Sequence, residues 1–260
     1  MENDGGIVIW PNKQNILGVN ISATTYEEAL VCVIKAAKAR NSGCVSHIAV
    51  HGLIEGSKDL RFRSILEEFE IVAPDGQPVR LALRLLHGTN LPDRCYGPEF
   101  MLHVCRRAAV EGIGVFLYGS HPNVVESLRK HLIAQIPGLA IVGWEPSVFR
   151  PLTEVEDNAL VSRINESKTG IVFVGLGCPL QETFAYAHRK KIKAVQICVG
   201  AAFDFLSQNK KMAPVWMQRN SLEWLFRLIQ EPRRLWRRYL ITNTIFLWRL
   251  FLQLSRVKKY

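Results

Sequence analysis

Short apolar runs alternate with amphipathic stretches along most of this chain. The runs end in glycine or a polar turn, and each following stretch repeats apolar residues every three or four positions. The first pattern is typical of buried strands and the second of helices. Strands that alternate with helices over about 200 residues predict an α/β fold with a mostly parallel sheet and flanking helices.

The pattern sets approximate bounds for the elements and divides the chain in two. We expect an α/β domain over residues 1–205 and a helical appendage over residues 206–260. The expected strands are 15–21, 45–50, 71–73, 115–118, 139–142, 171–174 and 194–199. The expected helices begin at the Thr24-Thr25 capping pattern and end near 40, then follow at 57–68, 77–87, 99–111, 122–135, 154–167, from about 179, at 221–231 and at 233–254.

Asp75 stands at the most informative turn of the chain. The apolar run Ile71-Val72-Ala73 ends in Pro74-Asp75-Gly76, and a helical pattern begins at once. The residues just after the carboxyl end of a strand are where α/β sheets usually place their chemistry. Aspartate is also a favoured helix N-cap. The local pattern therefore leaves two interpretations of Asp75 open, a catalytic carboxylate and a helix cap.

Glycines follow several expected strands and predict a phosphate-binding edge of the sheet. Gly119, Gly175 and Gly177 would let a ligand approach backbone N–H groups at helix N-termini. The Gly175-Leu176-Gly177 turn lacks the third glycine of a dinucleotide fingerprint, because Leu stands at position 180. This argues against an NAD-dependent oxidoreductase or epimerase and favours a nucleotide-sugar or another phosphorylated ligand as the bound molecule. The chain also has no P-loop and no Asp-x-Asp pair for a metal–diphosphate clamp.

The net charge of +10 is confined to the end of the chain. Residues 1–204 carry as many acids as bases, whereas residues 205–260 hold only Glu223 and Glu231 as acids. In a helix after Pro232, Arg234, Arg238, Arg249 and Arg256 fall within about 60° of one another. The opposite side carries Trp236, Tyr239, Leu240, Phe246, Leu247, Leu250, Phe251 and Leu254.

A basic face opposite an apolar one is typical of a helix that lies in a membrane interface. The longest uncharged run, Tyr239–Trp248, is too short to span a bilayer. We therefore expect a peripheral protein on an anionic membrane surface. Docking of this helix on the globule or on another subunit is the alternative, and a homo-oligomer is left open. Nucleic-acid binding fits the charge but not the apolar face.

A series of short motifs runs in order through the chain from Asn15 to Tyr239. The motifs are Pro74-Asp75-Gly76, Leu91-Pro92-Asp93-Arg94 with Gly97, Phe173-Val174-Gly175-Leu176-Gly177-Cys178-Pro179-Leu180-Gln181-Glu182, Gly200-Ala201-Ala202-Phe203-Asp204-Phe205, Ala213-Pro214, Leu222-Glu223-Trp224-Leu225-Phe226-Arg227, Glu231-Pro232-Arg233-Arg234-Leu235 and Arg237-Arg238-Tyr239. In this order they resemble the WecG/TagA/CpsF glycosyltransferases, glycosyltransferase family 26.

The resemblance implies a Rossmann-like α/β fold and an inverting hexosyltransferase that needs no metal or other cofactor. It would move a sugar from a UDP donor to a polyprenyl-diphosphate-linked saccharide at the cytoplasmic face of the plasma membrane. In the family, the Asp matching Asp75 is the proposed general base. The residues matching Gln181 and Asp204 line the nucleotide site, and the arginines matching Arg227, Arg234 and Arg237 close over the donor diphosphate.

The complete expected site follows from the motifs and the strand ends. Asp75 is the expected catalytic residue, and no metal ligand is expected. The expected substrate-binding residues are His51, Gly76, Arg94, Gly119, Gly175, Gly177, Gln181, Asp204, Arg227, Arg234 and Arg237.

One departure from the family pattern bears on the donor sugar. Many members carry Thr-x-Asn after the strand at 45–50, whereas this chain reads Ala49-Val50-His51-Gly52. The chain in this respect resembles the exopolysaccharide branch of the family, which favours glucose, an N-acetylhexosamine or its uronate. The alternatives are an N-acetylmannosamine or N-acetylmannosaminuronate transferase of teichoic-acid or common-antigen type and, in another class, a non-catalytic membrane-surface scaffold.

Overall fold

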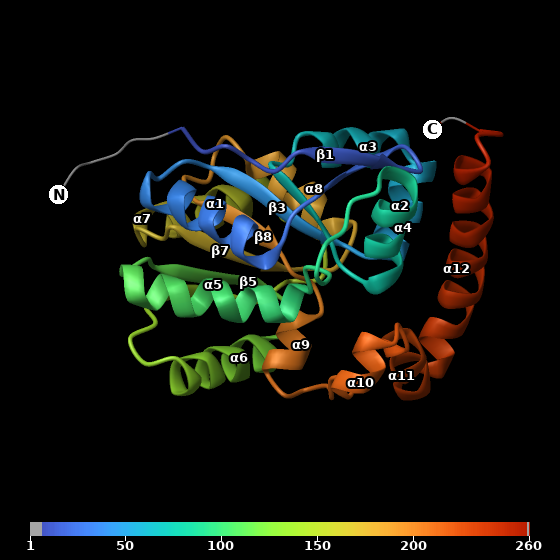
Figure 1. Ribbon diagram of the computed structural model, residues 1–260. Helices are drawn as coiled ribbons and strands as arrows, with labels where there is room; N and C mark the ends of the chain where they lie inside the picture. The colour runs from blue at the N-terminus through green and yellow to red at the C-terminus, as the bar shows by residue number, and fades with distance from the viewer. Residues whose placement is uncertain (1–6, 259) are drawn as a thin grey trace.

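A six-stranded, fully parallel sheet forms the centre of the molecule (Figure 1). The computed structural model describes residues 7–258 and 260, apart from the side chain of Arg238. The strand order is β4-β3-β8-β7-β5-β6. The strands are β3 (Gly43–Ile48), β4 (Ile71–Pro74), β5 (Val115–Gly119), β6 (Ile141–Glu145), β7 (Ile171–Gly175) and β8 (Val195–Cys198).

Helices cover both faces of this sheet, as Figure 1 shows. Alternate strand residues point to opposite faces, so the apolar strand residues contribute to two separate cores. One core joins the sheet to α1 (Tyr26–Lys38), α5 (Gly97–Glu111), α6 (Pro122–Gln135) and α9 (Ala202–Leu206). The other joins it to α2 (Val50–Lys58), α3 (Leu60–Glu67), α4 (Gln77–His87), α7 (Glu154–Glu166) and α8 (Leu180–His188). The predicted α/β class is thus confirmed.

The first expected strand, 15–21, is a hairpin instead. β1 (Lys13–Ile16) and β2 (Val19–Ser22) pair antiparallel in a sheet of their own. Leu17 and Gly18 form the turn, with φ angles of 52° and 86°. Both angles lie in the left-handed region that tight hairpin turns require. Leucine is unusual there, which is why the sequence gives little sign of the turn.

Several elements differ from their predicted bounds. The strand expected at 45–50 ends at Ile48, and Val50 already begins α2. The helix expected at 57–68 is divided at Asp59, whose carboxylate accepts hydrogen bonds from the N–H groups of Arg61 and Phe62. This Asp caps α3 and ends α2 at the same residue. His51 consequently lies in the first turn of a helix rather than at a strand exit. The strand expected at 139–142 lies two residues later, at β6.

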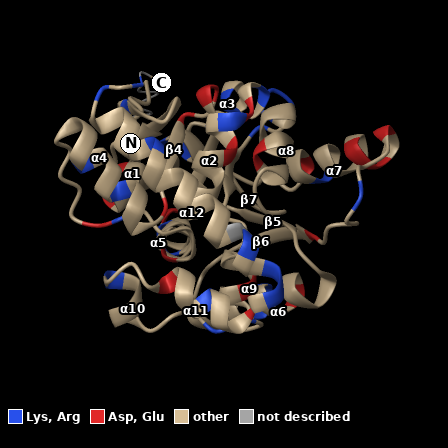
Figure 2. Ribbon diagram, turned by 90° about the vertical axis from the view of Figure 1, so that its right-hand side faces the viewer, with Lys and Arg blue, Asp and Glu red and all other residues tan. Residues whose placement is uncertain are grey.

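Three helices follow residue 206 in the described part of the chain, and the last is long and lies along the core. They are α10 (Val215–Arg219), α11 (Glu223–Gln230) and α12 (Pro232–Leu254). Figures 1 and 2 show α12 beside α2 and α4, and its residues Phe246 and Leu250 are buried in the second core. None of the described helices combines the length and the apolar character of a membrane-crossing segment.

The predicted division of α12 into a basic and an apolar face is wrong in part. Arg249 lies on the docked side, where its Nη1 donates a hydrogen bond of 2.6 Å to Ser57 Oγ. Phe246 and Leu250, expected on the apolar face, are buried in the second core, as the alternative of a helix docked on the globule predicts. The helix docks because these apolar residues remove surface from water. Arg238 was also expected on the basic face, but its side chain lies outside the described part of the chain.

Candidate functional site

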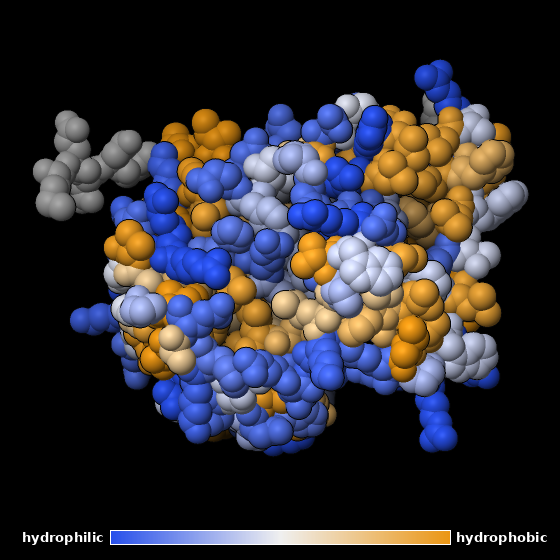
Figure 3. All heavy atoms as spheres, turned by 60° about the horizontal axis from the view of Figure 1, so that its bottom comes forward, coloured by the Kyte–Doolittle hydropathy of each residue, from blue (hydrophilic) through white to orange (hydrophobic). Residues whose placement is uncertain are grey.

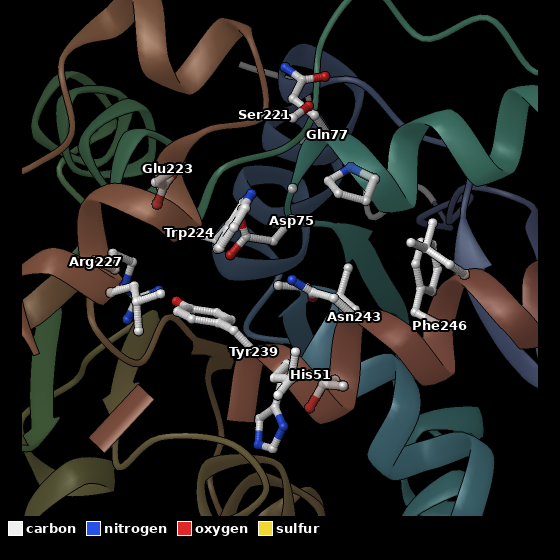
Figure 4. A pocket seen from close by; sticks show the side chains of 18 of the residues that line it. His51, Asp75, Gln77, Ser221, Glu223, Trp224, Arg227, Tyr239, Asn243 and Phe246 are labelled. Atoms are coloured by element: carbon white, nitrogen blue, oxygen red, sulfur yellow. The ribbon is translucent and has the colours of Figure 1, made fainter. Parts of the chain in front are cut away.

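A cavity of about 730 Å³ opens between the carboxyl edge of the sheet and the appendage. Its core side consists of residues that follow β3 and β4, together with Arg94 and Tyr96, and its other side consists mainly of α11 and α12. Figure 4 shows Asp75 in the middle of the labelled side chains that line this cavity. Among those side chains, Trp224, Arg227, Tyr239 and Asn243 come from the appendage.

The backbone around Asp75 is fixed by its neighbours on both sides. The Asp75 N–H donates a hydrogen bond of 3.0 Å to the carbonyl of Ile48, which continues the β3–β4 pairing. The Cys95 N–H donates one of 2.9 Å to the carbonyl of Pro74. Gly76, with φ of 124°, then turns the chain into α4 as its N-cap. A side chain at Gly76 would be strained in this conformation.

The carboxylate of Asp75 is not the helix cap that the local pattern also allowed. Gly76 holds the N-cap position of α4, and no side chain caps that helix. Within residues 7–258 and 260, no hydrogen bond or ion pair engages the Asp75 carboxylate, which lines the cavity instead. A carboxylate held free in a cavity is available to a ligand.

Burial raises the pKa of Asp75 to about 7. Loss of water disfavours the charged form of a carboxyl group. The positive charges of Arg94 and Arg227 oppose this effect, and the negative charge of Glu223 reinforces it. A carboxyl group with a pKa near neutrality can accept a proton in one step and release it in the next, as general base catalysis requires.

Arg94 lies close to Asp75 and is held from the appendage. It follows α4 in a loop that the Cys95–Pro74 hydrogen bond ties to the end of β4. Its Nη2 lies 2.6 Å from Glu223 Oε2 of α11 and donates to Gln218 Oε1 of α10 at 3.1 Å. The guanidinium also stacks over the Tyr96 ring, 4.1 Å from its centre. The appendage therefore contacts the core through a charged group beside Asp75.

Five of the residues expected in the site line this cavity together: His51, Asp75, Gly76, Arg94 and Arg227. Arg227 reaches it from α11, with its guanidinium 5.6 Å from the centre of the Phe205 ring. His51 reaches it from the first turn of α2, and its Nδ1 lies 3.9 Å from Glu55 Oε1. Residues more than 150 positions apart thus share one cavity.

The other expected residues do not line the cavity, and their part in binding stays a prediction. Gly119 and Gly175 pack against each other, since a Cβ on Gly119 would lie 2.7 Å from the Gly175 backbone. Gln181 is buried, and its Oε1 accepts a hydrogen bond from the Gly177 N–H. The remaining three are engaged elsewhere: Asp204 with Lys210, Arg234 with Glu231, and Arg237 over the Trp236 ring.

Several residues that line the cavity were not among the expected site residues. Tyr96, Trp224, Tyr239 and Asn243 form much of its wall, and Glu223 contributes its carboxylate. Glu223 gave one available signal, because it is one of only two acids in the basic appendage. Trp224 and Tyr239 stand in motifs that carry the family resemblance, but aromatic residues at helical spacing are as typical of a core as of a site.

Comparisons with known proteins all indicate similarity to glycosyltransferases. A family model described as the glycosyl transferase WecG/TagA/CpsF family matches residues 14–260. The chain is similar to the N-acetylglucosaminyldiphosphoundecaprenol N-acetyl-beta-D-mannosaminyltransferase of Bacillus subtilis strain 168, with 34% identity over 185 residues, 70% of this chain and 69% of that protein. The protein of the same name from Bacillus spizizenii is 32% identical over 187 residues, 72% of this chain and 70% of that protein.

Proposed function

Because the chain belongs to the glycosyl transferase WecG/TagA/CpsF family, and is accordingly a hexosyltransferase, we propose that it transfers N-acetylmannosamine from a UDP donor. The proposed acceptor is N-acetylglucosamine linked through a diphosphate to a polyprenyl lipid. The names of both relatives support this donor sugar and this acceptor. The comparisons thus favour the N-acetylmannosamine alternative over glucose and the exopolysaccharide branch, for which they offer no support. They also weaken the alternative of a non-catalytic scaffold.

The reaction we propose is a direct displacement with inversion. The Asp75 carboxylate accepts the proton of an acceptor hydroxyl while that oxygen forms a bond to the anomeric carbon of the donor. The bond between this carbon and the diphosphate oxygen breaks, and UDP leaves with the electron pair. The observation that carries the proposal is the free Asp75 carboxylate in the cavity, with its pKa raised to about 7.

Positive groups near Asp75 would stabilise the departing diphosphate. Arg94 and Arg227 are close enough to Asp75 to lower its pKa. Guanidinium groups bind phosphate oxygens through pairs of parallel hydrogen bonds and stabilise charge that develops during the reaction. In this proposal they take the role that a metal ion has in other transferases.

A peripheral membrane location completes the proposal. α12 exposes an apolar stripe, shown at the right of Figure 3, where Figure 1 places this helix. Two of its members, Leu240 and Leu247, are 65% exposed and also line the cavity. An apolar stripe of this kind favours a membrane interface and would bring the lipid acceptor to the site. The stripe consists of Trp236, Leu240, Ile241, Leu247, Trp248, Phe251 and Leu254.

The test is release of UDP by the purified protein with a polyprenyl-diphosphate-linked N-acetylglucosamine acceptor. UDP-N-acetylmannosamine, UDP-N-acetylglucosamine and UDP-glucose are offered in parallel. Acceptor-dependent release from UDP-N-acetylmannosamine alone is the expected result. Release only from UDP-glucose would return the donor assignment to the exopolysaccharide branch. No release from any donor, together with no binding of UDP, would refute the transferase.

A further inference from the structure

Arg94 forms part of a wall between two cavities. A second cavity of about 320 Å³ shares Gln77, Arg94 and Tyr96 with the first. Glu223 lines the first cavity and Gln218 lines the second. The two appendage residues that hold Arg94 thus approach it from different cavities. A change at this contact would alter the wall that both cavities share.

The way in which Arg94 is held leaves part of its guanidinium available. Glu223 and Gln218 both contact Nη2. Within residues 7–258 and 260, no hydrogen bond involves Nη1 or Nε of Arg94, and its ion pair with Glu223 is shortest at Nη2. The side chains of Arg94 and Glu223 are only 8% and 13% exposed. A guanidinium that is fixed at one nitrogen presents its remaining donors in a defined direction, which suits two-point recognition of a phosphate.

The position of Glu223 is unusual for the segment that carries it. The appendage holds a large excess of basic residues and only two acids. Glu231 pairs within the appendage, with Lys210 and Arg234, whereas Glu223 pairs with the core. Burying two charges costs desolvation free energy, which only good pairing geometry offsets. A nearly buried pair beside a site therefore calls for a role that compensates this cost.

We propose that Glu223 is a positioning residue: by pairing with Arg94 it holds α11 closed against the core and aims the free donors of Arg94 at a phosphate group of the donor. The ligand class is a nucleoside diphosphate, so this inference rests on the proposed function. Glu223 itself touches no reacting atom. Glu223 affects transfer indirectly, because it fixes Arg94 and keeps α11, which carries Arg227, in its closed position.

The test compares Glu223→Gln with the unchanged protein in two measurements. Gln keeps the size of the side chain and a hydrogen-bond acceptor but removes the charge. Hydrogen exchange is first measured over residues 215–231 of the free protein, where we expect exchange faster by roughly tenfold. The KM for UDP-N-acetylmannosamine should then rise by about tenfold or more, with a smaller change in kcat, because ground-state binding of the diphosphate is lost. Glu223→Asp should restore part of both effects.

Glu111→Gln is the matched control. Glu111 also pairs with two cations, Lys38 and Arg107, but lies at the opposite end of α5 from the site. The Glu111→Gln variant should leave hydrogen exchange over residues 215–231 and the KM for UDP-N-acetylmannosamine unchanged. Faster exchange in Glu223→Gln with an unchanged KM would overturn the positioning role, and unchanged exchange would overturn the closure of α11. If the unchanged protein transfers from no donor, the proposed function and the positioning role both fail. Hydrogen exchange over residues 215–231 would still decide whether Glu223 holds α11 closed against the core.

Discussion

Arg249 of α12 donates a hydrogen bond of 2.6 Å to Ser57 Oγ at the end of α2, 192 positions earlier in the chain. This contact joins the appendage to the helix that carries His51. Together with the buried Phe246 and Leu250, it explains why α12 lies along the core. The cavity exists because α12 docks in this way, so residues far from Asp75 control the shape of its surroundings.

Removing this contact should loosen the appendage. Arg249→Met keeps most of the length of the side chain and removes the hydrogen bond, so we expect the free energy of unfolding to fall by about 1–2 kcal/mol. Urea denaturation measures this loss. Arg256→Met is the control, since Arg256 is exposed and follows α12. Equal stability of the two variants would show that the Arg249–Ser57 contact contributes nothing.

The pKa of Asp75 predicts a pH dependence of transfer. A general base must be deprotonated, so kcat/KM should rise with pH and level off above about 7. Glu223→Gln removes a negative charge that raises this pKa, and the rising limb should then move to lower pH. Profiles of kcat/KM for both proteins test this. A rising limb centred near pH 4, or one that moves to higher pH in the variant, would contradict the assigned environment of Asp75.

The same burial predicts a stability effect. The raised pKa of Asp75 means that the folded state binds a proton more tightly than the unfolded state, so this group stabilises the fold at low pH and loses that effect as pH rises through about 7. At pH 8, Asp75→Asn should therefore stabilise the protein by roughly 1–3 kcal/mol, because it removes a desolvated charge. Thermal unfolding at pH 5 and pH 8 measures this. A destabilisation at pH 8 would refute it.

Membrane contact should depend on the apolar stripe of α12. Leu247→Glu with Phe251→Glu places two charges on this stripe, and binding to vesicles with anionic lipid should weaken by about tenfold or more. Co-sedimentation measures the bound fraction. Val110→Glu with Val155→Glu is the control, because both residues are exposed on α5 and α7, away from α12. Equal loss in the two double variants would attribute binding to net charge rather than to the stripe.

Removal of metal ions should not slow transfer if arginines stabilise the diphosphate. We expect the rate with EDTA to stay within about twofold of the rate without it, since Arg94 and Arg227 provide fixed positive charge near Asp75. The measurement is UDP release before and after chelation. A loss that added Mg²⁺ or Mn²⁺ restores would show that the arginines are insufficient.

Local pattern was sufficient to predict the sheet and the place of Asp75. The strand, turn and helix at 71–87 each have a recognisable residue pattern, and the helix at 77–87 has the predicted bounds. The hairpin turn at Leu17 was missed because Leu rarely adopts a positive φ. The break at Asp59 was missed because a helix cap inside an apolar pattern resembles an ordinary exposed Asp.

Long-range contacts account for what the sequence could not predict about the site. The pairing of Arg94 with Glu223, and the docking of Arg249 on Ser57, join residues more than 100 positions apart. Helical periodicity places Arg249 on a face of α12, but only packing decides whether that face meets water or the core. For the same reason the helix pattern identified the basic appendage but not its position, and the expectation that it closes over the donor site came from the family resemblance alone.

The most direct test of the account is transfer by Asp75→Asn. The variant and the unchanged protein are compared for acceptor-dependent UDP release from UDP-N-acetylmannosamine, with UDP affinity measured in parallel by calorimetry. We predict a rate at least about a hundredfold lower with UDP affinity nearly unchanged, because Asn cannot accept the proton. A variant that keeps a rate near that of the unchanged protein would contradict the assignment of Asp75 as the general base.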